Sequence, residues 1–198
     1  MTDFTVHTLE TAPAASQPLL KNLKEAIGFI PNLYAVFAES PAALRGALAI
    51  GDAFSRSSLS PTQQQLVALA ASEANDCQFC MAAHSTFAKR VAHMDPALVA
   101  AARARESLPD AKLDALVTFT RKVVEQRGFV ADADVEAFFH AGYTKAQTIE
   151  VLLGVGMKTF NNYVDHIAHV PLNDQFKAEA WQPKQPAGAP RVANERAA

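Results

Sequence analysis

Helix-start signals recur along this sequence, and they constrain its fold more than any other feature. Ser60 stands where an N-cap belongs, Pro61 follows it at the first helical position, and Gln63 completes a capping box. Thr144 and Gln147 form a second capping box of the same spacing. Apolar residues follow these starts at intervals of three or four, and no segment shows strand alternation with hairpin turns. The sequence therefore predicts an all-α fold, a compact array of several helices.

The 198 residues suit one helical domain with a different composition at each end. Residues 1–15 form a lead-in of small and polar residues that includes Pro13. From Pro183 onward, prolines stand among alanine, glutamine and charged residues, a mixture that buries too little apolar surface to be ordered. We predict a helical domain over residues 16–182 and a tail over residues 183–198 that is flexible or lies on a neighbouring subunit.

Charge and hydropathy exclude several classes of partner. A formal net charge of −2 without a long basic run argues against nucleic acid. No charged-then-apolar leader opens the chain, and no apolar stretch is long enough to cross a bilayer. We therefore predict a cytoplasmic protein without a membrane partner. In that compartment a Cys-x-x-Cys pair is more often catalytic or metal-binding than a structural disulfide.

Both cysteines of the chain lie in one short segment that also holds a histidine. Cys77, Cys80 and His84 are spaced by three and four residues, so a helix brings them to one face. Asp76 is a good N-cap, which places both cysteines in the first turn. There the free backbone N–H groups and the helix dipole favour a thiolate, and His84 can accept the thiol proton or stabilise the anion. The segment predicts redox thiol chemistry.

The cysteines continue an apolar stripe, which indicates that they face the interior. Leu66, Leu69 and Glu73 precede Cys77 at intervals of three or four residues. Such a stripe is also compatible with cysteines that act only as small hydrophobic core residues. The polar Glu73 and His84 on this otherwise apolar face favour a functional site.

A metal site is an alternative interpretation of the same residues. Cys77, Cys80 and His84 offer three zinc ligands, and His166 or Glu73 is available as a fourth. Two cysteines and one histidine in consecutive turns are atypical of a closed structural zinc site. We therefore predict a redox dithiol with neither a metal nor a cofactor.

Several segments together resemble the carboxymuconolactone decarboxylase/alkylhydroperoxidase D-like family, in its peroxidase-related branch. The similarity runs from about Gly28 to Pro171. It rests on Leu59-Ser60-Pro61, Ser72-Glu73-Ala74-Asn75-Asp76-Cys77, the Cys77-x-x-Cys80-x-x-x-His84 unit, Ile30-Pro31-Asn32-Leu33 and Asn162-Tyr163-x-x-His166. The resemblance implies a helical fold with the cysteine hairpin at a subunit interface, and a homo-oligomer.

The resemblance also implies a mechanism. Cys80 would attack a hydroperoxide and pass through a sulfenic acid, and Cys77 would resolve that species to a disulfide. His84 would belong to a proton relay that deprotonates Cys80. A dithiol reductant, a thioredoxin-like or lipoyl protein, would restore the thiols by exchange.

One position departs from the family pattern. The family's relay includes a glutamate twelve residues before the first cysteine, and this chain has Gln65 there. Glutamine can orient His84 or hold a water molecule, but it cannot accept a proton. Either the relay is weakened or Glu73 takes over the role.

Three functions follow as hypotheses. The first is a thiol-dependent peroxidase that uses Cys80, Cys77 and His84, with Glu73 and Gln65 in or near the relay. The second is a lactone decarboxylase, the reaction in the family's name, which needs acid–base groups rather than a thiol pair. The third is a non-enzymatic redox sensor whose dithiol oxidises once.

Overall fold

Residues 4–183, which the computed structural model describes, fold entirely into helices and connecting segments, without a β-strand. The all-α prediction is confirmed. The first three residues of the lead-in and residues 184–198 of the predicted tail lie outside the described part of the chain. The helices are α1 Gln17–Ile27, α2 Asn32–Phe37, α3 Pro41–Ser55, α4 Pro61–Ala74, α5 Gln78–Arg90, α6 Pro96–Ala104, α7 Ala111–Glu125, α8 Asp132–His140, α9 Lys145–Ala168 and the 3-10 helix η1 Asp174–Glu179.

The two predicted capping boxes are both formed. The Ser60 hydroxyl accepts the N–H of Gln63, and the Gln63 side chain accepts the N–H of Ser60. Thr144 and Gln147 make the same reciprocal pair at the start of α9. Each box satisfies two backbone donors that a helix start leaves free, so these starts follow from local sequence.

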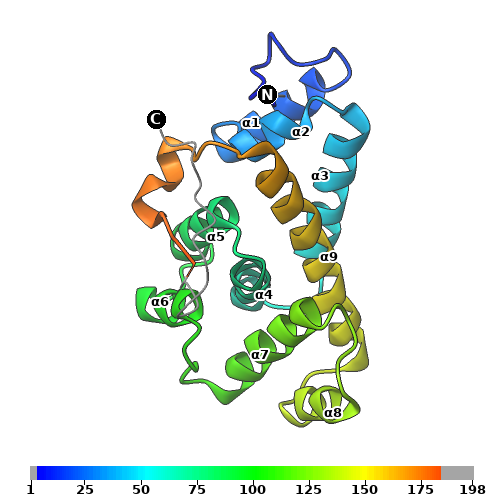
Figure 1. Ribbon diagram of the computed structural model, residues 1–198, viewed down its shortest axis with the longest axis vertical. Coiled ribbons are helices and arrows are strands. Elements are labelled where there is room, and N and C mark those ends of the chain that lie inside the picture. Colours follow the sequence, from blue (N-terminus) through cyan, green and yellow to red (C-terminus); the bar gives the residue numbers. More distant parts are fainter. Residues whose placement is uncertain (1–3, 184–198) are drawn as a thin grey trace, which may run out of the picture.

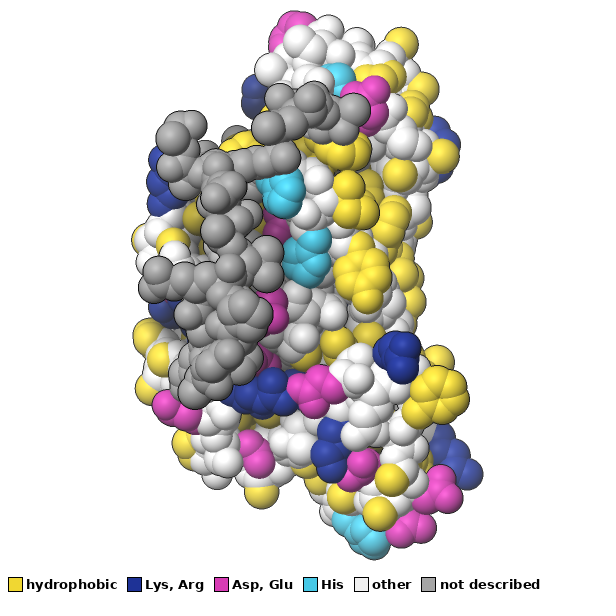
Figure 2. Space-filling view, in the orientation of Figure 1, with side chains coloured by type: hydrophobic (Ala, Val, Ile, Leu, Met, Phe, Trp, Pro, Cys, Tyr) yellow, Lys and Arg dark blue, Asp and Glu magenta, His cyan; other side chains and the backbone are white. Residues whose placement is uncertain are grey.

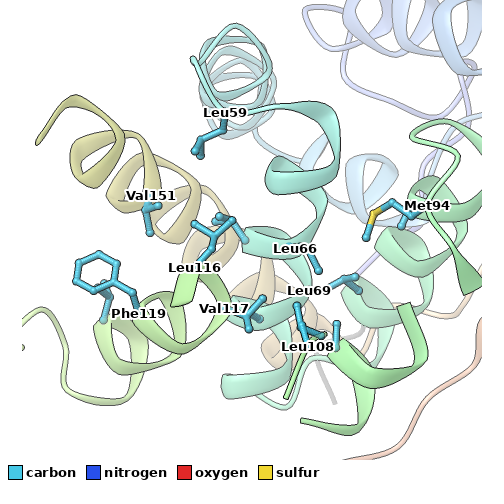
Figure 3. Packing of buried hydrophobic residues seen from close by; sticks show 14 of the residues in the cluster. Leu59, Leu66, Leu69, Met94, Leu108, Leu116, Val117, Phe119 and Val151 are labelled. Carbon is cyan, nitrogen blue, oxygen red and sulfur yellow. The ribbon is translucent and has the colours of Figure 1, made fainter. Parts of the chain in front are cut away.

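Helix α4 lies in the middle of the molecule, with α5, α6, α7 and α9 around it (Figure 1). Leu66 and Leu69 of α4 are fully buried, and Leu116 and Val117 of α7 face them in the same cluster. Figure 3 shows this packing, with Val151 of α9 reaching in from another side. Because α4 is enclosed, the segment that follows it is held inside the molecule rather than on its surface.

The C-terminal part of the described chain packs back onto α5. Phe176 of η1 is 1% exposed and meets the rings of Phe29, Phe79 and Phe87 edge-on. Such edge-to-face contacts add to the area that the rings bury. This aromatic cluster fixes η1 beside the helix that carries the cysteines.

The helix α9 approaches α3 and α4 closely at a glycine. A Cβ atom on Gly154 would lie 2.7 Å from the ring of Phe54 and 2.8 Å from Cγ1 of Val67. Both neighbours are buried, so neither can move freely away. Glycine is therefore required here for packing, and not for its backbone conformation.

Gly154→Ala is expected to destabilise the fold by about 1–3 kcal/mol, the usual cost of overpacking a filled core. Gly46→Ala is the matched control, because Gly46 lies in α3 with no atom near the position of its Cβ. Alanine there is expected to stabilise by about 0.5–1 kcal/mol through helix propensity. Urea unfolding followed by circular dichroism measures both, and equal effects of the two substitutions would contradict the close approach at Gly154.

Within residues 4–183, none of the helices combines the length and the apolar character that a bilayer crossing requires.

Candidate active site

The break between α4 and α5 places the two cysteines. Asp76 adopts the left-handed conformation, with φ of 55°. Its N–H donates to the carbonyl of Glu73, and the N–H of Cys77 donates to the carbonyl of Ser72. These two bonds are those of a Schellman motif, with aspartate in the place of the usual glycine. The predicted N-cap at Asp76 is therefore wrong, because Asp76 ends α4 and Cys77 caps α5.

The sulfur of Cys77 contacts both Cys80 and the helix α9. Its sulfur accepts the N–H of Cys80 at 3.4 Å, which is the N-cap interaction of α5. Its thiol donates to Oδ2 of Asp165 at 3.2 Å. Burial raises the pKa of Cys77, and the neighbouring Cys80 and Asp165 raise it further. Cys77 is therefore the protonated member of the pair at neutral pH.

A buried lysine lies against His84. Lys158 of α9 is 1% exposed, and its Nζ is 3.0 Å from Nε2 of His84. The other ring nitrogen of His84, Nδ1, is 3.0 Å from Oε1 of Gln65. Burial and the charge of Lys158 hold the pKa of His84 well below its ordinary value. We therefore assign a neutral ring that donates from Nδ1 to Gln65 and accepts from Lys158 at Nε2.

The same lysine acts on Cys80. Burial alone would raise the pKa of this thiol, since the side chain is 1% exposed. The neighbouring Cys77 side chain and the charge and hydrogen bond of Lys158 outweigh that effect and lower the pKa of Cys80 to about 7. Burial and the charge of Cys80 in turn raise the pKa of Tyr34 to about 12. Cys80 is thus half ionised near neutral pH beside a buried cation.

Four of the five predicted site residues lie in this cluster, and the fifth, Glu73, makes other contacts. Cys77, Cys80, His84 and Gln65 lie within one connected cluster, ordered as Gln65, His84, Lys158 and Cys80. The carboxylate of Glu73 instead binds two arginines, Nε of Arg121 in α7 at 3.1 Å and Nη1 of Arg105, the residue after α6, at 3.6 Å.

Two polar residues of this cluster were missed from the sequence, Lys158 and Asp165. Both belong to the inward face of α9, together with Val151, Gly154 and Asn161. One sequence feature could have indicated them. Both residues fall at intervals of three or four residues on the apolar face of an amphipathic helix, where charged side chains are unusual. A charged residue is buried there only when a partner compensates it.

Within residues 4–183, an all-helical fold buries a Cys-x-x-Cys dithiol beside a lysine and a histidine. Residues 35–116 match the model of the Carboxymuconolactone decarboxylase family. Over these residues the resemblance seen in the sequence is confirmed.

Solved structures share the fold across nearly the whole chain. An alkylhydroperoxidase AhpD core, an uncharacterized peroxidase-related protein from Ralstonia eutropha JMP134, superposes with a TM-score of 0.79 at 22% identity, over 91% of this chain and 97% of the other. A second uncharacterized peroxidase-related protein, from Silicibacter sp. TM1040, gives 0.76 at 20% identity, over 88% and 92%.

A third structure is described by its chemistry. The debrominase Bmp8, in its C82A form with 2,3,4-tribromopyrrole, gives a TM-score of 0.77 at 16% identity, over 90% of this chain and 96% of the other. At such identities these likenesses concern the fold. The comparison with curated proteins gave no match.

Proposed function

We propose that this protein is a thiol-dependent peroxidase that reduces hydroperoxides through Cys80 and Cys77. The observation that carries the proposal is the Cys80 thiol, which lies beside Cys77 and the buried Lys158 and has a pKa of about 7. A thiolate is the nucleophile in peroxide reduction, and a neighbouring ammonium is a proton donor for the leaving oxygen.

The first step transfers one oxygen atom. The Cys80 thiolate attacks the terminal oxygen of the hydroperoxide, the O–O bond breaks, and Lys158 gives a proton to the departing alkoxide. The products are a Cys80 sulfenic acid and an alcohol, or water from hydrogen peroxide. His84 accepts a hydrogen bond from Lys158 at 3.0 Å and so positions its amine for this transfer.

The second step closes the disulfide. Cys77 gives its proton to the Asp165 carboxylate, 3.2 Å away, and the resulting thiolate attacks the sulfenic sulfur. Hydroxide leaves and takes the proton back from Asp165 as water. Burial raises the pKa of Asp165, which suits a group that accepts and returns a proton. A dithiol reductant, thioredoxin-like or lipoyl, then restores both thiols and the proton of Lys158 by exchange.

The test is peroxide-dependent disulfide formation between Cys77 and Cys80, timed against its re-reduction by a dithiol. Hydrogen peroxide is the first substrate to try, because both sulfurs are buried and a small molecule reaches them most easily. We expect one disulfide per subunit and repeated turnover once dithiol is added. Oxidation that occurs once and is not reversed would instead support the redox-sensor hypothesis.

A second candidate function is that of a decarboxylase, the reaction in the name of the matching family. Decarboxylation of a lactone requires acid–base groups and needs no thiol. A double variant, Cys77→Ser with Cys80→Ser, separates the two functions: a decarboxylase retains its activity and the proposed peroxidase loses it.

Gln65→Glu is expected to raise peroxide turnover. A carboxylate in place of the Gln65 oxygen would accept the His84 Nδ1–H more strongly, raise the pKa of the ring and let it take part in proton transfer. The increase is measured as kcat with hydrogen peroxide and dithiol, against Gln64→Glu as a control on the neighbouring position. A lower kcat in Gln65→Glu would show that this relay is incorrectly assigned.

We further propose that the protein is a homo-oligomer that pairs through an exposed apolar stripe on α9. The stripe consists of Ile149, Leu152, Phe160, Tyr163 and Ile167, each 40–67% exposed, with Gly156 between its two halves. Figure 2 shows hydrophobic side chains gathered over α9 on this face of the molecule. Apolar residues at intervals of three and four along one exposed face are typical of helix pairing.

The double variant Ile149→Glu, Ile167→Glu is expected to sediment as a monomer of about 21.3 kDa, whereas the unaltered protein forms a larger species. Charges at both ends of the stripe would be left unpaired in the interface. Val91→Glu is the matched control, because Val91 is as exposed as Ile167, at 67%, but lies off α9. Dissociation by the control, or an oligomer in the double variant, would place the interface elsewhere.

A further inference from the structure

A cavity opens beside the dithiol, on the side of Asp165. It has a volume of about 830 Å³, and Asp165, His166 and His169 of the α9 end line it together with Asp76, Phe79 and Trp181. On the face shown in Figure 2, histidine side chains lie next to the hydrophobic ones. The mechanism above uses Asp165 and leaves the rest of this cavity without a role.

Three ligand atoms of different chemistry converge beside this cavity, which Asp165 and His166 line and Cys77 does not. The sulfur of Cys77, a carboxylate oxygen of Asp165 and a ring nitrogen of His166 all lie within 4.8 Å of one another. Cys77 and Asp165 are buried, whereas His166 is exposed. Two donors are therefore fixed by the fold, and the third is free to adjust.

The charge on Asp165 is incompletely compensated. Its hydrogen bonds come from the Cys77 thiol, which is a weak donor, and from the backbone N–H of Val170. Among residues 4–183 no lysine or arginine lies within ion-pair distance of it, and the charge of Lys158 acts on it only from farther away. A buried carboxylate in that state attracts a cation, and a metal ion can take the place of the Cys77 proton.

We propose that Cys77, Asp165 and His166 bind a zinc ion, with a fourth position open to the cavity. Thiolate, imidazole and carboxylate are the donors that zinc takes, and three protein ligands with one open position form a tetrahedral site. In such a site the donors stand about 3.4–3.6 Å apart. The Cys77–Asp165 distance of 3.2 Å is already close to that value, so rotation of the exposed His166 ring completes the site.

This donor set differs from the zinc ligands considered in the sequence, which were Cys77, Cys80 and His84 with His166 or Glu73 as a fourth. The two ring nitrogens of His84 are engaged by Gln65 and Lys158, and the Lys158 ammonium faces Cys80. Zinc would therefore bind on the Asp165 side of Cys77. Because a Cys77–Cys80 disulfide uses the same sulfur, the metal-loaded protein cannot form it, so metal binding and the dithiol cycle exclude each other.

Cobalt titration of the untagged, fully reduced protein tests the proposal without any activity assay. Cobalt bound to a thiolate gives a near-ultraviolet charge-transfer band, and zinc, which binds more tightly, displaces it. We expect this band in the unaltered protein and its loss in Cys77→Ser. His166→Gln, a change at an exposed side chain, is expected to weaken cobalt and zinc binding at least tenfold, since even supporting residues of metal sites have effects of about that size.

Two control variants separate this site from its neighbours. Cys80→Ser is expected to keep the band, because Cys80 is not a ligand. His169→Asn is also expected to keep it, since His169 lines the cavity but is not among the three donors, and asparagine tolerates its left-handed φ of 49°. Absence of the band, an unchanged cobalt affinity in His166→Gln, or loss of the band in Cys80→Ser would overturn the assignment.

Discussion

Lys158→Met is expected to raise the pKa of the Cys80 thiol from about 7 to 8.5 or more. The substitution removes the cation that opposes the effect of burial on Cys80, so the thiolate loses a main source of its stabilisation. Peroxide turnover is expected to fall on the order of 100-fold, because the variant lacks both the thiolate at neutral pH and the proton donor.

The pH dependence of Cys80 alkylation measures this change directly. Only the thiolate reacts, so the rate in the unaltered protein rises with pH through a midpoint of about 7. The midpoint in Lys158→Met is expected at least about 1.5 pH units higher. A midpoint that stays near 7 would show that Lys158 does not stabilise the thiolate.

The Lys158→Met variant is expected to fold, so unfolding would not account for its higher alkylation midpoint or its lower turnover. Methionine has nearly the length of the lysine stem, and the Cys80 thiolate can take up a proton once the cation is removed, so no buried charge is left unpaired. Lys145→Met is the matched control, since Lys145 is an exposed lysine at the start of the same helix. Its alkylation midpoint and turnover are expected to match those of the unaltered protein, and urea unfolding compares all three.

Cys80→Ser is expected to abolish peroxide consumption, whereas Cys77→Ser is expected to consume one equivalent and stop. Without a reductant, the unaltered protein consumes one equivalent per subunit and ends as the disulfide. In Cys77→Ser the reaction ends at the sulfenic acid, because no second thiol is present to resolve it. The asymmetry follows from the two environments, Cys80 beside a lysine and Cys77 beside a carboxylate.

Dimedone labelling followed by mass spectrometry locates the sulfenic acid. We expect a single adduct on Cys80 in the peroxide-treated Cys77→Ser variant and none in Cys80→Ser. An adduct on Cys77 in the Cys80→Ser variant, with peroxide consumed, would exchange the two roles and contradict the proposed mechanism.

The helix starts could be predicted from the sequence because their interactions are local. The capping boxes at Ser60 and Thr144 each use side chains three residues apart. The boundary at Asp76 could not be predicted in the same way. Aspartate is favoured both as an N-cap and in the left-handed conformation, and the two preferences place the helix start one residue apart.

The candidate site could be predicted only where its residues are close in sequence. Cys77, Cys80 and His84 form one motif, and the family resemblance added Gln65. Lys158 meets His84 across 74 residues, and Asp165 meets Cys77 across 88. These contacts depend on how α9 packs against α4 and α5, which helical periodicity does not specify.

The hydrogen bond between Cys77 and Asp165 has a consequence for the reduction potential of the pair. Disulfide formation removes the Cys77 S–H and leaves the buried carboxylate without that donor, a cost that only the oxidised form carries. The reduction potential of the Cys77–Cys80 pair is therefore more positive, which makes the oxidised protein a better electron acceptor. A carboxylate that takes no part in the attack on peroxide would then govern which reductants can regenerate the enzyme.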